Sequence, residues 1–225
     1  MPSSIVHIGF GFLVAVGLLG AYYDGRALLA VVAFLLVPEA DTLMGLFMAG
    51  AHRTVLHNVV FAAVVAGVLY WETTRADSRI RGRFGDYGVR VAWVGLFAHT
   101  FAHLALDWAH LDGINALWPL HDQFFRLEGE AYLSTTDGFV QTFVDVARDA
   151  ETGERRVDPG GRGGRAEHHI ANPVQPSPET DPDPDRRFPI AVHGWQLYLV
   201  LVGVFTVVAR RLQTPRYGQE AEDDV

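Results

Sequence analysis

The chain has 225 residues, of which 49% are hydrophobic and 20% are charged, and its formal net charge at pH 7 is -8. Such an acidic chain is a poor candidate for binding nucleic acid, and the absence of cysteine excludes disulfides, thiolate metal ligands and thiol nucleophiles. All of its basic side chains apart from histidine are arginines, and this lysine-free, acidic composition resembles that of proteins from halophilic archaea.

Five apolar stretches approach the roughly 20 residues that a helix needs to cross a bilayer. They are residues 5–23, 27–37, 55–71, 89–108 and 190–209. The second is short because Pro38 ends it, and we expect the following apolar run, residues 43–51, to fold back into the membrane interface. The pattern predicts an all-α polytopic membrane protein with about five transmembrane helices.

Arginines orient these helices in the cell membrane, because short loops rich in arginine stay on the cytoplasmic side. One cluster lies between the third and fourth stretches and another follows the fifth: Arg75, Arg79, Arg81, Arg83 and Arg90, then Arg210, Arg211 and Arg216. We therefore predict a multi-pass protein with its N-terminus outside and its C-terminus in the cytoplasm.

The chain divides into four predicted parts. Residues 1–120 form a membrane bundle, and residues 190–225 form the last transmembrane helix and a cytoplasmic tail. Between them we expect an extracytoplasmic insert: a small β-hairpin in residues 121–149, with strand-like runs joined at Thr136-Asp137-Gly138, and then a tether in residues 150–189. The tether is rich in glycine, proline and aspartate, a composition typical of disorder.

Ionisable side chains stand at the ends of the apolar stretches, and the predicted topology puts them all on the outer side. They are His7, Glu39, Asp41, His52, His57, His103 and Asp107. Such groups are costly at membrane depth, so they usually face a bundle interior, a polar cavity or a metal. A shared site at the outer interface of the membrane is therefore predicted.

His103 and Asp107 are four residues apart and so share one face of a helix, with His99 one turn earlier. This spacing suits a metal site, but it also suits a ladder of hydrogen bonds that holds a bundle together. His52 and His57 are five residues apart and would point about 140° apart on one helix. Both can face one ion if His52 precedes the helix, with Thr54 as its N-cap.

Two further residues are candidates for catalysis. Arg53 matches the bidentate geometry of a phosphate or carboxylate, although an arginine here could equally reach out to lipid headgroups. Glu39 stands two residues before Asp41 at the break after Pro38, so that one carboxylate could bind metal while the other acts as a general base. A solvated turn is the alternative for this pair.

The order of these motifs resembles the membrane-bound, metal-dependent hydrolase family, YdjM-like proteins also described as LexA-binding and inner-membrane-associated. The resemblance covers about the first 120 residues and rests on His7, Leu36-Val37-Pro38-Glu39-Ala40-Asp41, His52-Arg53, His57-Asn58, Ala102-His103 with Asp107, Gly113 and Leu117-Trp118-Pro119. The family has aspartate in place of Glu39, histidine in place of Thr42, and Thr-His-Ser in place of Leu56-His57-Asn58. His99 is the residue that helical spacing offers for the missing histidine.

The resemblance implies a hydrolase. With the residues above, it predicts one or two divalent ions, with zinc favoured, held by His7, Asp41, His52, His57, His103 and Asp107, with Glu39 and Arg53 as catalytic residues. A site at headgroup depth makes a lipid phosphoester the expected substrate and membrane lipids the expected partners. The alternative is a non-catalytic membrane protein, either a metal or proton transporter or a scaffold with a structural histidine and aspartate network. The sequence identifies no protein partner.

Overall fold

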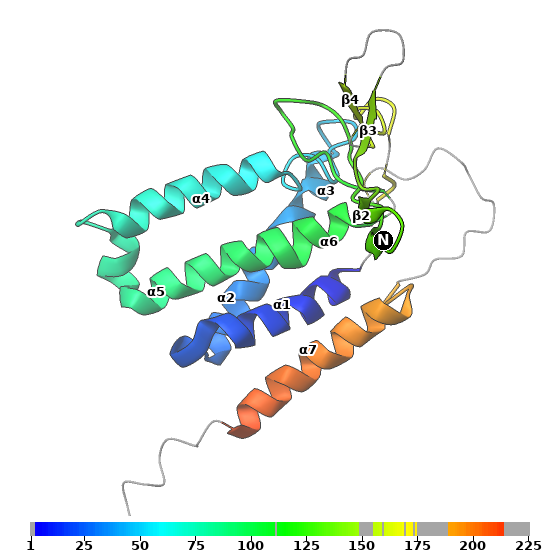
Figure 1. Ribbon diagram of the computed structural model, residues 1–225. Coiled ribbons are helices and arrows are strands. Elements are labelled where there is room, and N and C mark those ends of the chain that lie inside the picture. The colour runs from blue at the N-terminus through cyan, green and yellow to red at the C-terminus, as the bar shows by residue number, and fades with distance from the viewer. Residues whose placement is uncertain are drawn as a thin grey trace, which may run out of the picture.

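The computed structural model is a helical bundle with an insert of loops and short strands at one end (Figure 1). It describes residues 3–110, 112–148, 155–158, 160–168, 170–172, 174 and 189–213. In this part of the chain the structure is mostly helical, as the sequence predicts. The two longest helices are α5 (Arg79–Phe97) and α7 (Gly194–Gln213). Next come α1 (Ser4–Leu19) and α4 (Val59–Thr74), each of 16 residues, and α4 lies beside α5.

Three helical segments are long and apolar enough to cross a membrane by themselves: Ser4–Tyr22, which adds the short helix η1 (Gly20–Tyr22) to α1, Arg79–Trp108 and Gly194–Gln213. A fourth span exists if α2 (Gly25–Leu35) is counted with the segment Val37–Met44, which is bent away from it by 45°. Five spans are thus not confirmed. The missing one is α4, because its 16 residues reach only about 24 Å, less than the roughly 30 Å of a hydrocarbon core.

The bend after α2 confirms the predicted break at Pro38. Proline cannot donate a backbone hydrogen bond, so the α-helix stops and the chain continues as a 3₁₀ turn, η2 (Val37–Ala40), and one turn of α-helix, α3 (Asp41–Met44). Leu43 and Phe47, in and after that turn, are exposed. This apolar surface fits the predicted return into the membrane interface.

Side-chain caps set where the helices begin. Asp24 accepts a hydrogen bond from the backbone N–H of Ala27 at the start of α2, and Asn58 accepts one from Phe61 at the start of α4. The predicted cap at Thr54 is wrong, because its hydroxyl donates instead to the Gly50 carbonyl and α4 begins five residues later. His52 and His57 therefore both precede the helix.

The last span, α7, packs along α1 at very close range (Figure 1). A methyl group added to Gly203 would lie 2.0 Å from the carbonyl oxygen of Gly9. On the other side of α1, the apolar core is formed with α2 and α5 by side chains such as Leu19, Val31 and Val94. Most of the core is therefore shared by helices that are far apart in sequence.

The insert contains two antiparallel hairpins. The first pairs β1 (Ala131–Ser134) with β2 (Gly138–Gln141), which matches the hairpin that the sequence predicts. The second pairs β3 (Asp145–Arg148) with β4 (Arg155–Asp158), so strand β4 lies within the range predicted as a tether. The described residues after β4 return to the bundle, where Gly161 forms an isolated bridge with Phe125. More than half of the predicted tether, including residues 175–188, lies outside the described residues.

Candidate metal centre

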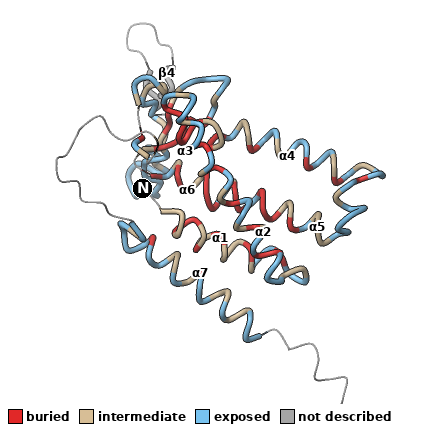
Figure 2. Tube along the Cα trace, turned by 180° about the vertical axis from the view of Figure 1, so that it is seen from behind, coloured by how far each residue is buried: buried red, intermediate tan, exposed pale blue. Residues whose placement is uncertain are grey.

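All six predicted metal ligands meet at the end of the bundle that carries the insert. His7 comes from α1, Asp41 from α3, and His52 and His57 from the loop before α4. His103 lies in η3 (Ala98–Leu104), a π-helical turn that continues α5, and Asp107 lies in α6 (Ala105–Trp108). Each side chain is no more than 3% exposed, and Figure 2 shows the buried residues concentrated at this end. The structure thus brings together the residues that the sequence predicts to share a site.

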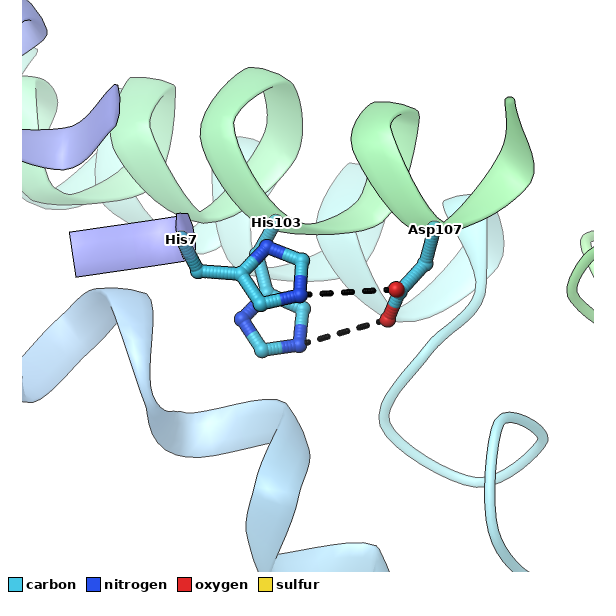
Figure 3. Close-up of side chains that lie close together, drawn as sticks. All are labelled: His7, His103 and Asp107. Atoms are coloured by element: carbon cyan, nitrogen blue, oxygen red, sulfur yellow. Dashed lines mark ion pairs between the residues drawn. The ribbon is translucent and has the colours of Figure 1, made fainter. Parts of the chain in front are cut away.

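His7, His103 and Asp107 form the first group of side chains that could hold a metal ion (Figure 3). Nε2 of His7 lies 3.4 Å from Oδ1 of Asp107, and Nε2 of His103 lies 3.6 Å from Oδ2. The two imidazole rings stack with their centroids 4.0 Å apart, so both direct the same nitrogen toward the carboxylate. Three donor atoms from two helices therefore face one small region.

His57 brings a fourth donor to the same region. Its Nε2 lies 3.0 Å from Nε2 of His103 and 3.3 Å from Oδ2 of Asp107. Ligands of a tetrahedral zinc ion with bonds of about 2.0–2.1 Å are about 3.3 Å apart. The separations observed here scatter around that edge length, and a set of imidazoles and a carboxylate without any thiolate is one that zinc accepts.

Asp41, His52 and His57 form the second group. Oδ2 of Asp41 lies 2.7 Å from Nδ1 of His57, and Oδ1 lies 2.9 Å from Nδ1 of His52. The hydroxyl of Thr42, which stands where the resembled family has histidine, lies 3.1 Å from the same His52 nitrogen. Because Nε2 of this His57 ring lies 3.0 Å from Nε2 of His103, Asp41 is connected to the first group through His57.

Hydrogen bonds to the other ring nitrogens fix how the ligands are presented. Nδ1 of His7 lies 2.9 Å from the carbonyl oxygen of Ala102, and this acceptor requires the proton to be on Nδ1. In a neutral ring, Nε2 of His7 would then carry the lone pair that a metal ion needs. In the same way, the Asp41 carboxylate accepts a hydrogen bond from Nδ1 of His57. Metal-binding histidines in proteins are commonly oriented by a carbonyl or carboxylate in this way.

Arg53 is fully buried and is paired with Asp107, so it does not reach out to lipid headgroups. Nη2 lies 2.6 Å from Oδ1 of Asp107, and Nη1 donates to the carbonyl of Gly113. Its φ of 59° is unusual for a residue with a side chain. The backbone N–H of Asn115 donates to the Arg53 carbonyl and so helps to hold this conformation. In this position Arg53 can hold Asp107 in place.

Two other predicted residues lie outside both groups. Glu39 accepts a hydrogen bond from the hydroxyl of Ser4 and is only half-buried, and its role as a general base stays a prediction. His99 is buried, but its ring packs against Phe61 and it does not join either group. Since η3 is π-helical, residues four apart there do not line up as they do on an α-helix. His99 therefore does not take the place of the family histidine at Thr42.

The surroundings of His57 favour the protonated form of its ring. Burial disfavours its charged form, but hydrogen bonds with Asp107 and Asp41 outweigh burial and raise its pKa to about 9. In the absence of a metal the ring is therefore protonated at neutral pH and bridges the two carboxylates. A metal ion would have to replace that proton.

Asn115 anchors loops at this end of the bundle, and no sequence pattern pointed to it. Asn115 is fully buried, and its side chain donates to Asp122 while accepting from the backbone N–H of Gln123. Arg165, after the second hairpin, also binds Asp122. The contact between Arg165 and Asp122 joins residues 43 apart in the chain, and only the folded chain shows it.

Comparison with known proteins supports the family. No curated protein and no solved structure matches the chain. A family model described as YdjM inner membrane protein matches residues 1–157. The match extends beyond the 120 residues on which the resemblance rests and includes the first hairpin, which we had expected to lie outside it. With more than half of its length matched, this membrane protein belongs to the YdjM inner membrane protein family.

Proposed function

We propose that this protein is a metal-dependent hydrolase that acts on a lipid phosphoester at the membrane interface. The observation that carries the proposal is that Nε2 of His7, of His57 and of His103 lie 3.4, 3.3 and 3.6 Å, respectively, from a carboxylate oxygen of Asp107, separations that suit ligands of one zinc ion. Zinc with room for a water molecule beside its protein ligands would lower the pKa of that water and so supply hydroxide near neutral pH.

A single ion accounts for the contacts better than two. Nδ1 of His57 is directed at Asp41 and Nε2 at the first group, so a neutral His57 ring can give only one nitrogen to a metal. Asp41 would then orient His57, and His52 would support Asp41. A second ion in the second group would require His57 to lose both ring protons.

The remaining residues are assigned from their contacts. Arg53 is a positioning residue that holds Asp107 through Nη2. Glu39 is proposed to relay a proton from the rim of the site, where it is bonded to Ser4. The arginine clusters, at the opposite end of the bundle from the metal centre, support an orientation with the site on the extracytoplasmic side. Phospholipid headgroups lie at that depth.

A structural metal centre is the second candidate function, and the burial of the site favours it. The ligands are at most 3% exposed, and four protein donors would fill a tetrahedral ion, as in structural zinc sites. Such a centre would join α1, the loop before α4 and the end of α5 without turning over any substrate.

Zinc content and lipid hydrolysis, measured on the same samples, test both candidates. Full-length protein purified in detergent is compared with His103→Ala, Asp107→Ala and the control His121→Ala, an exposed histidine bonded to Gln123. The hydrolase proposal expects zinc and phospholipid turnover in wild type and control, and neither in the two ligand variants. Zinc without turnover would support the structural centre, and equal turnover in all four proteins would overturn the metal-dependent mechanism.

A further inference from the structure

Helices that adjoin the segments with the metal ligands form an apolar groove next to the site. The groove has a volume of about 350 Å³, which lies within the range of roughly 300–1,000 Å³ for small-molecule sites. Its lining comes from α2, α4 and α5 and includes Phe34, Phe61, Val65, Val68, Ala92 and His99. Almost the whole lining is hydrocarbon, so a polar substrate could not bind in it favourably.

The groove opens sideways to the surroundings of the bundle. Val64 and Val68 on its α4 side are each 60% exposed, and Phe34 on α2 is 43% exposed. In a membrane protein these exposed apolar side chains face lipid. Hydrocarbon chains can therefore enter the groove from the bilayer without crossing water.

The length of the groove matches that of one lipid chain. It extends along α4 from Phe61 to Glu72, a distance of roughly 16 Å at the helical rise of about 1.5 Å per residue. This is about half of the roughly 30 Å hydrocarbon core, the depth that one leaflet provides. Glu72 closes the far end, where it is paired with Arg75.

The near end of the groove leads to the metal centre. His57 lies two residues before α4, and His99 lies four residues before His103, so both walls continue directly into ligands. The ring of His99 bonds to the backbone of Phe34, but its Nε2 has no hydrogen-bond partner among the described residues, although the residue is only 4% exposed. An unpaired polar atom in such a position is costly unless something binds it.

We infer that the groove holds one hydrocarbon chain of a membrane phospholipid, which enters it from the bilayer. The headgroup of the same lipid is thereby directed toward the region between His57 and His103. The inference rests on the proposed function and specifies its substrate as a chain-bearing lipid, bound by its chain as well as by its headgroup.

Photolabelling tests the groove without relying on turnover. Full-length protein is reconstituted in phosphatidylcholine vesicles that contain a phosphatidylcholine with a diazirine in the middle of one acyl chain, and labelled peptides are mapped by mass spectrometry. We expect labelling concentrated on residues 61–69 and 92–99. Labelling spread evenly over lipid-facing helices, α7 included, would overturn the inference.

Variants that fill the groove with a larger side chain are compared with a variant that adds the same side chain outside it. Ala92→Phe and Val65→Phe place a ring inside it, whereas Ala63→Phe adds the same ring to an exposed position of α4 outside the lining. Labelling of the groove should fall about tenfold in the first two variants, because losing contact with about two methylene groups weakens binding by that factor. The control should label as wild type does, and unchanged labelling in both groove variants would contradict the inference.

One more variant separates this inference from the hydrolase proposal. His103→Ala should lose zinc but keep its labelling. Labelling without turnover in wild type would thus reject the hydrolase alone, and turnover without groove labelling would reject the groove alone.

Discussion

Nη2 of Arg53 lies 2.6 Å from Oδ1 of Asp107, and both side chains are buried although 54 residues separate them in the chain. The pair joins the loop before α4 to α6. Asp107 also faces His7, His57 and His103, so Arg53 fixes the carboxylate around which the first group is arranged.

We expect Arg53→Ala to destabilise the metal-free protein by about 3–5 kcal/mol, because it leaves the Asp107 carboxylate buried without its cation. Arg81→Ala is the matched control, since Arg81 pairs with Asp86 on the exposed surface and should contribute less than about 1 kcal/mol. Thermal unfolding in detergent after chelation measures both. Similar losses in the two variants would show that the buried pair has no special role.

Asp41→Asn should weaken zinc binding by about 10–100-fold without abolishing it, because Asp41 orients His57 from outside the first group. Asp107→Asn should reduce bound zinc much further, since it removes a ligand. Asp122→Asn, which alters a carboxylate bonded to Asn115 and Arg165, is the control and should bind zinc normally. Competition titration against a chelator gives the three affinities. An Asp41→Asn loss as complete as that of Asp107→Asn would favour Asp41 as a ligand itself.

Zinc affinity should rise with pH. The pKa of His57 is raised to about 9, so at neutral pH zinc must displace its proton, and affinity should increase about tenfold per pH unit from pH 7 toward pH 9. In the metal-free protein the same raised pKa stabilises the fold below pH 6.5, and this stabilisation is lost as the pH rises through about 9. Titrations at several pH values, with proton release followed in weak buffer, measure the slope. A flat profile would mean that His57 does not bind the ion.

Gly203→Ala should loosen α7 from α1, because the added methyl group would lie 2.0 Å from the Gly9 carbonyl oxygen and the backbones would have to separate. Gly67→Ala in α4 is the control, since nothing lies within 4 Å of its added methyl group, and it should stabilise the helix by up to about 1 kcal/mol. Thermal unfolding in detergent compares them. A Gly203→Ala protein as stable as wild type would show that the close approach is dispensable.

The sequence alone predicted the apolar stretches and the ionisable residues at their ends, because both depend on residues close together in the chain. Hydrophobic length predicts helices, Pro38 predicts the break after α2, and Thr136-Asp137-Gly138 predicts the first hairpin. The cost of ionisable groups at membrane depth predicts that His7, Asp41 and His103 share a site, and these residues do meet.

The sequence by itself determined the class of protein, a helical membrane protein, and the residue types available to its site. Only the tertiary structure decided how those residues are paired: Arg53 with Asp107, Asp41 with both His52 and His57, and His99 with the apolar groove instead of the metal centre. The reason is physical. Periodicity and capping act over a few residues along the chain, whereas side-chain partners are set by how helices distant in sequence pack together, and burial makes each of those pairings matter.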